Sequence, residues 1–203
     1  MAGDAPMSDD RAAVEARIRA ATDSARWGDA TTAALTGYGD ELLGYLVAVT
    51  RNETDATDAF SIFAESLWRG LATFRWDCSF RTWAYGLARN ALARLKRDPH
   101  RRRAVVLDDS HVEALVEQLR SRTATFLRTE TKDKIARLRA ELAPDDQTLL
   151  ILRINRGLAW RDIARVLAPD GDAATPAALD KHAAALRKRF ERLKTEIKQR
   201  ARA

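Results

Sequence analysis

The chain has 203 residues, of which 46% are hydrophobic, so it can bury a core and is not disordered throughout. Its 9 glycines and 5 prolines are too few for a turn-rich β architecture and favour helices. The net charge of +6 points to a polyanionic partner, and the single cysteine, Cys78, excludes an internal disulfide and a cysteine-rich zinc site.

The first half of the chain shows three helical patterns and then a fourth of unusual composition. Apolar side chains recur at steps of three and four over residues 10–26, 31–49 and about 54–71. Thr54 or Asp55 is a suitable N-cap for the third helix. After the loop TFRWDC, Ser79 is a suitable N-cap for a helix that ends near Arg97, because the residue before Pro99 is disfavoured in the α conformation.

The pattern weakens between Pro99 and about Thr129. Only residues 111–119 keep helical spacing there, and their flanks are polar and irregular. A segment of this length without regular structure is unusual inside one compact domain. We therefore expect an all-α fold of two small helical domains joined by a linker.

The remainder of the chain predicts a helix-turn-helix with a lengthened turn. Helices are expected at about residues 131–142, 144–154, 160–167 and 177–199. Gly157 can adopt the left-handed conformation that ends a helix. The break APDGDAATP separates the short third helix from the long basic fourth helix, which is the helix-turn-helix layout with extra residues in its turn.

Two parts of the chain carry motifs that can be compared with a known family. The helix at 79–97 opens with Ser79-Phe80-Arg81-Thr82-Trp83 and continues with Tyr85, Ala88, Arg89 and Asn90. It resembles the promoter-melting segment of bacterial RNA polymerase sigma factors of the extracytoplasmic-function type. The preceding Asp55-Ala56-Thr57-Asp58, with Phe60, Phe63 and Trp68, is similar to the helix by which that family grips the polymerase clamp. The C-terminal part resembles the family's second domain at four motifs, which are Leu142-Ala143-Pro144, Leu149–Arg153, Gly157-Leu158 and Asp162-Ile163-Ala164.

The resemblance implies a division of the chain and a set of partners. Residues 1–28 would be an N-terminal extension, 29–98 a region 2-like domain, 99–129 a linker and 130–203 a region 4-like helix-turn-helix domain. Core RNA polymerase and promoter DNA are the implied partners, and an anti-sigma protein is compatible with the family. The residues expected to bind core polymerase are Asp55, Asp58, Glu65 and Trp68, although Trp68 can also pack on its own domain.

The aromatic and basic residues around the helix at 79–97 suit the opening of DNA. Breaking stacked pairs costs about 1.4 kcal/mol per step. Stacking a released base on an aromatic ring returns about 1–3 kcal/mol, and cations hold the backbone. We expect −10 contacts from Phe74, Arg75, Trp76, Phe80, Arg81, Tyr85, Arg89, Asn90, Arg94, Lys96 and Arg97.

Several of these positions have a second interpretation. Phe80, Trp83 and Leu87 are spaced three and four apart and can be core residues, whereas Arg81, Tyr85 and Arg89 are expected outside. Asn90 can cap or brace instead of binding. Cys78 is expected to be a passive small residue and not a redox sensor.

The last helix is expected to dock on the −35 element. Its candidates for DNA contact are Lys181, His182, Arg187, Lys188, Arg189 and Arg192. A basic run is ordinarily a solvated face, and this simpler interpretation suits the cations near the C-terminus, which are Lys194, Lys198, Arg200 and Arg202.

Enzymatic functions have little support in the sequence. It contains no phosphate-binding glycine loop, no histidine pair at metal spacing and no nucleophile elbow, so no catalytic residue, metal or cofactor is expected. The N-terminus lacks the layout of a signal peptide, and no apolar run approaches the roughly 20 residues that span a bilayer, so we expect a cytoplasmic location without membrane insertion. We expect a transcription-initiation factor. The alternatives are a polymerase-independent helix-turn-helix regulator and a polybasic protein that binds RNA or membranes.

Overall fold

The chain folds into helices, with no strand among the residues that the structure describes. The computed structural model describes residues 7–97, 108–132, 141–168 and 175–200. The elements are α1 (Met7–Asp23), α2 (Trp27–Thr50), α3 (Glu53–Gly70), η1 (Leu71–Thr73), α4 (Phe80–Arg97), α5 (Ser110–Arg120), α6 (Thr123–Lys132), α8 (Pro144–Leu150), η2 (Ile151–Asn155), α9 (Trp160–Leu167) and α10 (Pro176–Arg200). The expected all-α class is confirmed. No helix in the described ranges is both long and apolar enough to cross a membrane.

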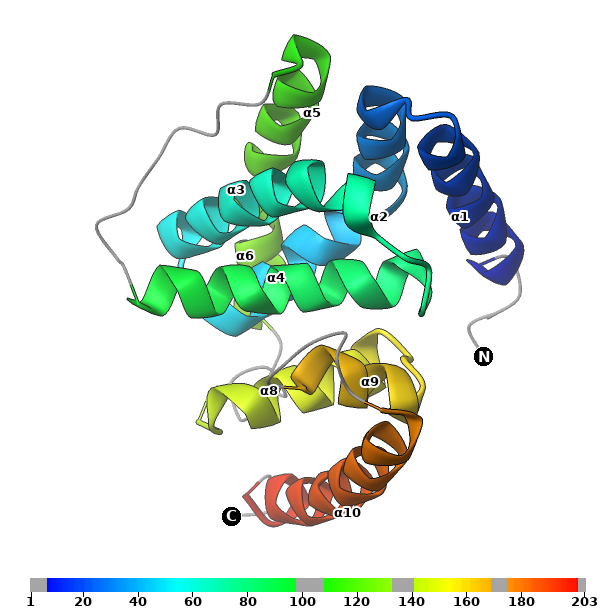
Figure 1. The fold of residues 1–203 in the computed structure, drawn as a ribbon. Helices are drawn as coiled ribbons and strands as arrows, with labels where there is room; N and C mark the ends of the chain where they lie inside the picture. The colour runs from blue at the N-terminus through cyan, green and yellow to red at the C-terminus, as the bar shows by residue number, and fades with distance from the viewer. Residues whose placement is uncertain (1–6, 98–107, 133–140, 169–174, 201–203) are drawn as a thin grey trace.

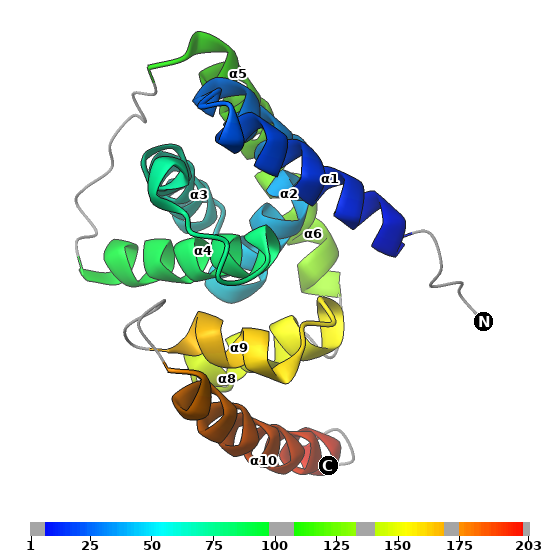
Figure 2. The same cartoon turned by 45° about the vertical axis from the view of Figure 1, so that its right-hand side comes forward.

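Helix α2 is the centre of the N-terminal helices, which are α1 to α6. It packs against α1, α3, α5 and α6 and also contacts α4 (Figures 1 and 2). Its buried side chains point in several directions and include Leu35, Leu42, Tyr45 and Leu46. A helix that is apolar on most sides is stable only when neighbours cover it, and α2 meets this condition.

Helices α5 and α6 lie in the segment expected to be an irregular linker. Asp109 caps α5 by accepting from the amides of His111 and Val112, and the α5 stripe of Val112, Val116 and Leu119 is buried. Both helices pack against α2 and α3. The expectation that the flanks of residues 111–119 are irregular is wrong for residues 123–129, which belong to α6. This helix is stabilised by packing against α2 and α3, which its polar sequence does not indicate. Residues 98–107 lie outside the described residues.

The C-terminal helices are α8, η2, α9 and α10. Pro144 occupies the first turn of α8 as expected, and Trp160–Leu167 has the expected bounds. The chain winds as a π-helix over Ile151–Asn155, where a regular helix was expected. Gly157 has φ +65° and the amide of Leu158 donates to the carbonyl of Leu152, so the expected left-handed helix end is confirmed.

The C-terminal helices lie against the N-terminal ones. Helix α9 packs on α4 and α8 contacts α2, and both views show α8 and α9 between α4 and α10 (Figures 1 and 2). Most of the expected helix at 131–142 and the acidic residues Asp170 and Asp172 of the lengthened turn lie outside the described residues.

Candidate nucleic-acid interface

A cluster of aromatic rings lies where the loop after η1 enters α4. Phe74 stacks on Trp83 with ring centroids 4.6 Å apart, and it also contacts Trp76 at 4.8 Å and Phe80 at 6.1 Å. Phe74, Trp76 and Trp83 are half-buried, whereas Phe80 is fully buried. Phe80 is therefore a core residue, Trp83 is partly so, and the accessible rings of this cluster are those of the loop and Trp83.

The first turn of α4 is held by two side chains. Ser79 Oγ accepts from the amide of Thr82 at 3.1 Å, so Ser79 caps the helix as expected. The carboxylate of Glu15, in α1, accepts from the amides of Phe80 and Arg81 at 3.0 Å each. The role of Glu15 escaped prediction because its partners lie 65 and 66 residues away in the sequence.

Tyr85 lies inside the molecule, so the expectation that it lies on the outside is wrong. Its side chain has no exposed surface, and its hydroxyl donates to Glu41 Oε1 at 2.7 Å. Burial, followed by the nearby Glu41 carboxylate, raises the pKa of the phenol well above its ordinary value. Glu41, on α2, provides the buried acceptor that lets the hydroxyl leave water.

Arg81 is also drawn inward and its expected exposure is wrong, since its side chain is only 12% exposed. Its Nε donates to Glu41 Oε1 at 2.8 Å, and one terminal nitrogen donates to the carbonyl of Arg156 at 2.7 Å. The guanidinium therefore joins α2, α4 and the end of η2. In this arrangement Arg81 faces protein groups.

The later polar side chains of α4 are more accessible. Arg89 is one-quarter exposed and lies 3.6 Å from Asp145 Oδ1, at the start of α8. Arg94 donates to Ser66 Oγ at 3.3 Å, whereas Asn90, Lys96 and Arg97 are exposed. In the loop, Arg75 is exposed and pairs with Asp77 at 3.2 Å. The cations of α4 thus become more accessible toward its C-terminal end.

The contact between the N-terminal helices and the C-terminal helices includes buried polar groups and a pocket. The hydroxyls of Tyr45 and Thr148 lie 3.5 Å apart, and burial raises the pKa of Tyr45 to about 12. Among the described residues, Arg156 Nε is buried without a hydrogen-bond partner. A pocket of about 450 Å³ separates the α4 loop from α9 and the start of α10.

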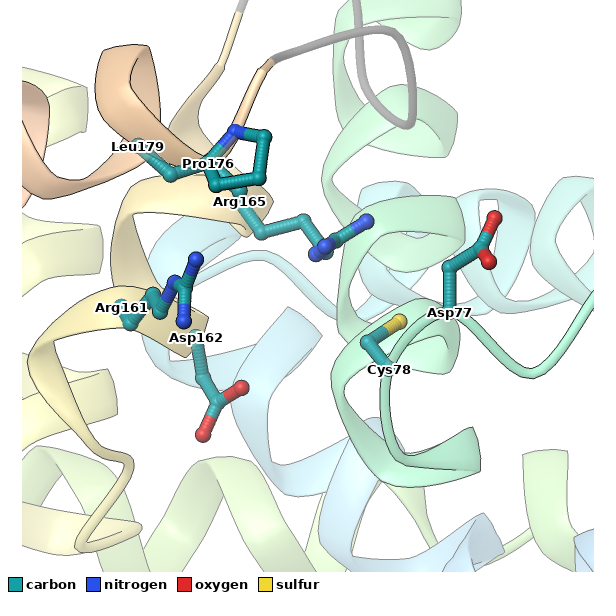
Figure 3. A pocket seen from close by; sticks show the side chains of 7 residues that line it. All are labelled: Asp77, Cys78, Arg161, Asp162, Arg165, Pro176 and Leu179. Atoms are coloured by element: carbon teal, nitrogen blue, oxygen red, sulfur yellow. The ribbon is translucent and has the colours of Figure 1, made fainter.

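Figure 3 shows the side chains that line this pocket. Asp77 and Cys78 belong to the loop, and Arg165 extends from α9 toward them. Arg161 and Asp162 lie on the same helix, below Pro176 and Leu179 of α10. The half-buried Cys78 therefore lines a gap between the two groups of helices.

The four residues expected to bind polymerase lie along α3. The N-cap of this helix is Asn52, whose side chain accepts from the amide of Asp55, so the expected cap at Thr54 or Asp55 is wrong. Asp55 is exposed, Asp58 and Trp68 are half-buried, and Glu65 pairs with Arg69 at 3.0 Å. Trp68 also packs against the core.

A groove of about 290 Å³ lies beside Asp55 and Asp58. Its apolar wall comes from the ends of α2 and α4, and it is lined by Val49, Thr50, Asp55, Asp58, Leu92, Leu95 and Lys96. Val49, Leu92 and Leu95 were not predicted to belong to a binding surface, because they lie on two helices that only the fold brings together.

The basic side chains of α10 are mostly open to solvent. Lys181, Arg187, Lys188 and Arg192 are exposed and His182 is half-buried. Arg187 lies over the ring of Trp160 at 5.6 Å. Arg189 instead donates to Asp146 Oδ1 at 2.5 Å, and this hydrogen bond raises the pKa of its guanidinium. All six predicted side chains are therefore at least partly exposed, but Arg189 is held against Asp146 of α8.

Comparison with known proteins identifies similarity over the N-terminal helices. Residues 35–103 match the family described as Sigma-70 region 2. The RNA polymerase sigma-H factor of Pseudomonas aeruginosa is 28% identical over an alignment of 138 residues, and the match covers 64% of this chain and 70% of that protein. No solved structure matches the chain. The matched range contains α3, the aromatic loop and α4.

Proposed function

We propose that this chain is a sigma factor that directs RNA polymerase to promoters, and that its N-terminal helices both hold the polymerase and capture the −10 element. The observation that carries the proposal is the ring cluster of Phe74, Trp76 and Trp83 at the start of a basic helix. Rings that stack bases, followed by cations that hold the backbone, are what a protein needs to trap a strand as it leaves the duplex.

Core RNA polymerase would bind along α3 and the neighbouring groove. Asp55, Asp58 and Glu65 offer carboxylates to a basic partner surface, and Val49 and Leu95 offer apolar area beside them. Trp68 would act as a partly buried anchor, since tryptophan is common at the centre of interfaces. The groove lies at the C-terminal end of α4 and the aromatic loop lies before its start, so one protein can engage polymerase at the groove and DNA at the loop at the same time.

Capture of the −10 strand would begin at the loop and continue along the exposed end of α4. Phe74, Trp76 and Trp83 are the candidates for stacking, and Arg94, Lys96 and Arg97 for backbone contact. We assign Tyr85 a supporting role, because its hydroxyl and its ring are both buried.

Arg81 and Arg89 would reach DNA only after the C-terminal helices move away from α4. Arg89 lies beside Asp145, and Arg81 donates to the Arg156 carbonyl, and both of these groups belong to the C-terminal part. Arg81 is also held by Glu41 of α2, within the N-terminal helices. The Nε of Arg156 is buried at this contact without a hydrogen-bond partner. The contact is therefore less favourable than a core in which every buried polar atom is hydrogen-bonded. We propose that binding of polymerase separates the two groups of helices, which releases Arg89 and leaves Glu41 as the partner of Arg81.

The exposed basic face of α10 would then dock on the −35 element. Lys181, Arg187, Lys188 and Arg192 can contact phosphates, and His182 can approach a base edge. The proposed division of the chain is unchanged: 1–28, 29–98, 99–129 and 130–203. We further propose the extracytoplasmic-function type, a cytoplasmic site of action, no enzymatic activity, and regulation by an anti-sigma protein.

The test is transcription in vitro with core polymerase, followed by sequencing of the transcripts. Transcripts that start at a shared promoter sequence are the expected result. Trp68→Ala should weaken polymerase binding, whereas Trp76→Ala should impair promoter opening and leave polymerase binding intact. Identical defects in both variants would contradict the division of roles. Tight binding to duplex DNA without any response to polymerase would instead identify a polymerase-independent regulator.

A further inference from the structure

We propose that Glu15, in the N-terminal extension, is a positioning residue for promoter melting. Its carboxylate holds the first turn of α4, and with Arg19 it fixes the loop that carries the aromatic cluster. The inference rests on the proposed capture of the −10 strand by this loop. If the inference holds, Glu15 and Arg19, which precede the matched residues 35–103, contribute to the activity of the helices within that range.

The first step is the hydrogen bonding of Glu15. Its Oε2 accepts from the amide of Phe80 and its Oε1 from the amide of Arg81, each at 3.0 Å. Ser79 accepts from the next amide, that of Thr82. The first amides of a helix have no partner within the helix. Glu15 and Ser79 together satisfy three of them, and the charge of Glu15 also suits the positive end of the helix dipole.

The second step is the contact one turn later on α1. The guanidinium of Arg19 lies 5.2 Å from the centre of the Trp76 ring. Trp76 has φ +60°, a left-handed conformation that is costly for a large side chain and persists only when the surroundings hold it. Arg19 on one side and Phe74 on another provide that support. α1 therefore contacts the loop at Trp76 and at its junction with α4.

The third step is the rigidity of α1 itself. Val14 and Ile18, on either side of Glu15 in the sequence, are buried against the core. Gly37 of α2 allows the close approach, because a Cβ at that position would overlap the Val14 side chain. Tyr38 of α2 donates to Glu15 Oε1 at 3.3 Å. Glu15 is thus held in place by α2, and its hydrogen bonds to the amides of Phe80 and Arg81 position the start of α4.

Loss of Glu15 should therefore change the geometry of the loop more than the global fold. The first turn of α4 would lose two hydrogen bonds to a charged acceptor, and the loop would lose the anchor at its C-terminal end. The groove proposed to bind polymerase is lined by residues at the end of α2, in the first turns of α3 and at the end of α4, and none of them is among the hydrogen-bond partners of Glu15, which are Tyr38, Phe80 and Arg81. Promoter opening and polymerase binding should separate in the variant.

The experiment compares Glu15→Ala, Glu15→Gln and Glu15→Asp in the full-length chain with core polymerase. Opening is measured by permanganate reactivity of unpaired thymines on a duplex promoter and on one with a pre-opened −10 region. Glu15→Ala should open the duplex about tenfold more slowly and transcribe the pre-opened template at the wild-type rate. Glu15→Gln, which keeps acceptor oxygen but not the charge, should fall between Glu15→Ala and wild type. Arg17→Ala, on the exposed side of α1, is the matched control and should behave as wild type.

The outcomes separate this inference from the proposed function. If wild type with polymerase opens no promoter, the proposed function fails. If wild type opens promoters and Glu15→Ala opens them equally fast, the positioning role of Glu15 is overturned. The role is also overturned if Glu15→Ala loses as much activity on the pre-opened template as on the duplex. The same holds if Glu15→Gln loses polymerase affinity to the same extent as it loses promoter opening. In either case the residue would serve only the general fold.

Discussion

The two basic helices, α4 and α10, look alike in the sequence and differ in the structure. In α4, Arg81 is held by Glu41 and the Arg156 carbonyl, and Arg89 by Asp145. In α10, most of the predicted DNA-contact cations are exposed, and Arg189 is held by Asp146. A run of basic residues in the sequence therefore does not indicate which of its side chains are accessible to DNA. Carboxylates and carbonyls from distant segments decide that.

The largest effect is expected from removing the carboxylate that holds an arginine of each helix, which is Glu41 of α2 for α4 and Asp146 of α8 for α10. Glu41→Ala should lower the free energy of unfolding by about 3 kcal/mol, because it leaves the nearly buried Arg81 and the buried Tyr85 hydroxyl without their acceptor. Asp146→Ala should cost about 1 kcal/mol or less, since Arg189 is more than one-third exposed. Urea denaturation measures both. Equal losses would show that α4 is not anchored more firmly than α10.

The second test asks whether the contact between α2 and α8, beside the anchored side of α4, is closed to water. Tyr45 is fully buried, and its pKa of about 12 exceeds the ordinary value of 10.0. Because the folded state favours the protonated phenol, its contribution to stability is complete below pH 10 and is lost as the pH rises toward 12. That contribution amounts to roughly 3 kcal/mol.

Tyr45→Phe should make the alkaline loss of stability less steep over this range, as measured by denaturation at pH 9 to 12. The variant also removes the hydroxyl contact with Thr148, so its stability at neutral pH is the reference for its own curve. Parallel curves for wild type and variant would mean that Tyr45 is open to solvent.

The smallest expected effect comes from releasing Arg89 without altering α4. Asp145→Asn removes the carboxylate 3.6 Å from Arg89 and should strengthen binding of the protein alone to a single-stranded −10 oligonucleotide up to about threefold. Fluorescence anisotropy at low salt measures the change. The matched control is Asp180→Asn, which makes the same charge change at the pair with Arg161. An equal gain in the control would assign the effect to net charge.

Most helices and several caps follow from the sequence alone. Ser79, Gly157 and the bounds of Trp160–Leu167 were predictable because each depends on neighbours within a few residues. Helix α6 was not, because its stability comes from packing against α2 and α3. The cap of α3 was misplaced because several polar residues in succession can each accept from a first-turn amide, and Asn52 is the one that does.

The candidate site divides in the same way. The aromatic loop could be identified from its composition, and the structure brings Phe74, Trp76 and Trp83 together there. Their contact with DNA stays a prediction, as do the polymerase contacts of α3 and the promoter contacts of α10. The inward position of Tyr85 could not be foreseen, since a tyrosine beside arginines suits an exposed face and a buried network equally well.

The sequence by itself determined the helical class, the order of the helices and the concentration of rings and cations near residues 74–97. These properties arise from periodicity, capping and composition, which act over short distances along the chain. Only the tertiary structure decided that Glu15 holds the start of α4, that Glu41 draws Arg81 and Tyr85 inward, and that α9 covers part of α4. The physical reason is that a buried donor or charge must find a partner, and that partner can come from any segment that the fold brings near.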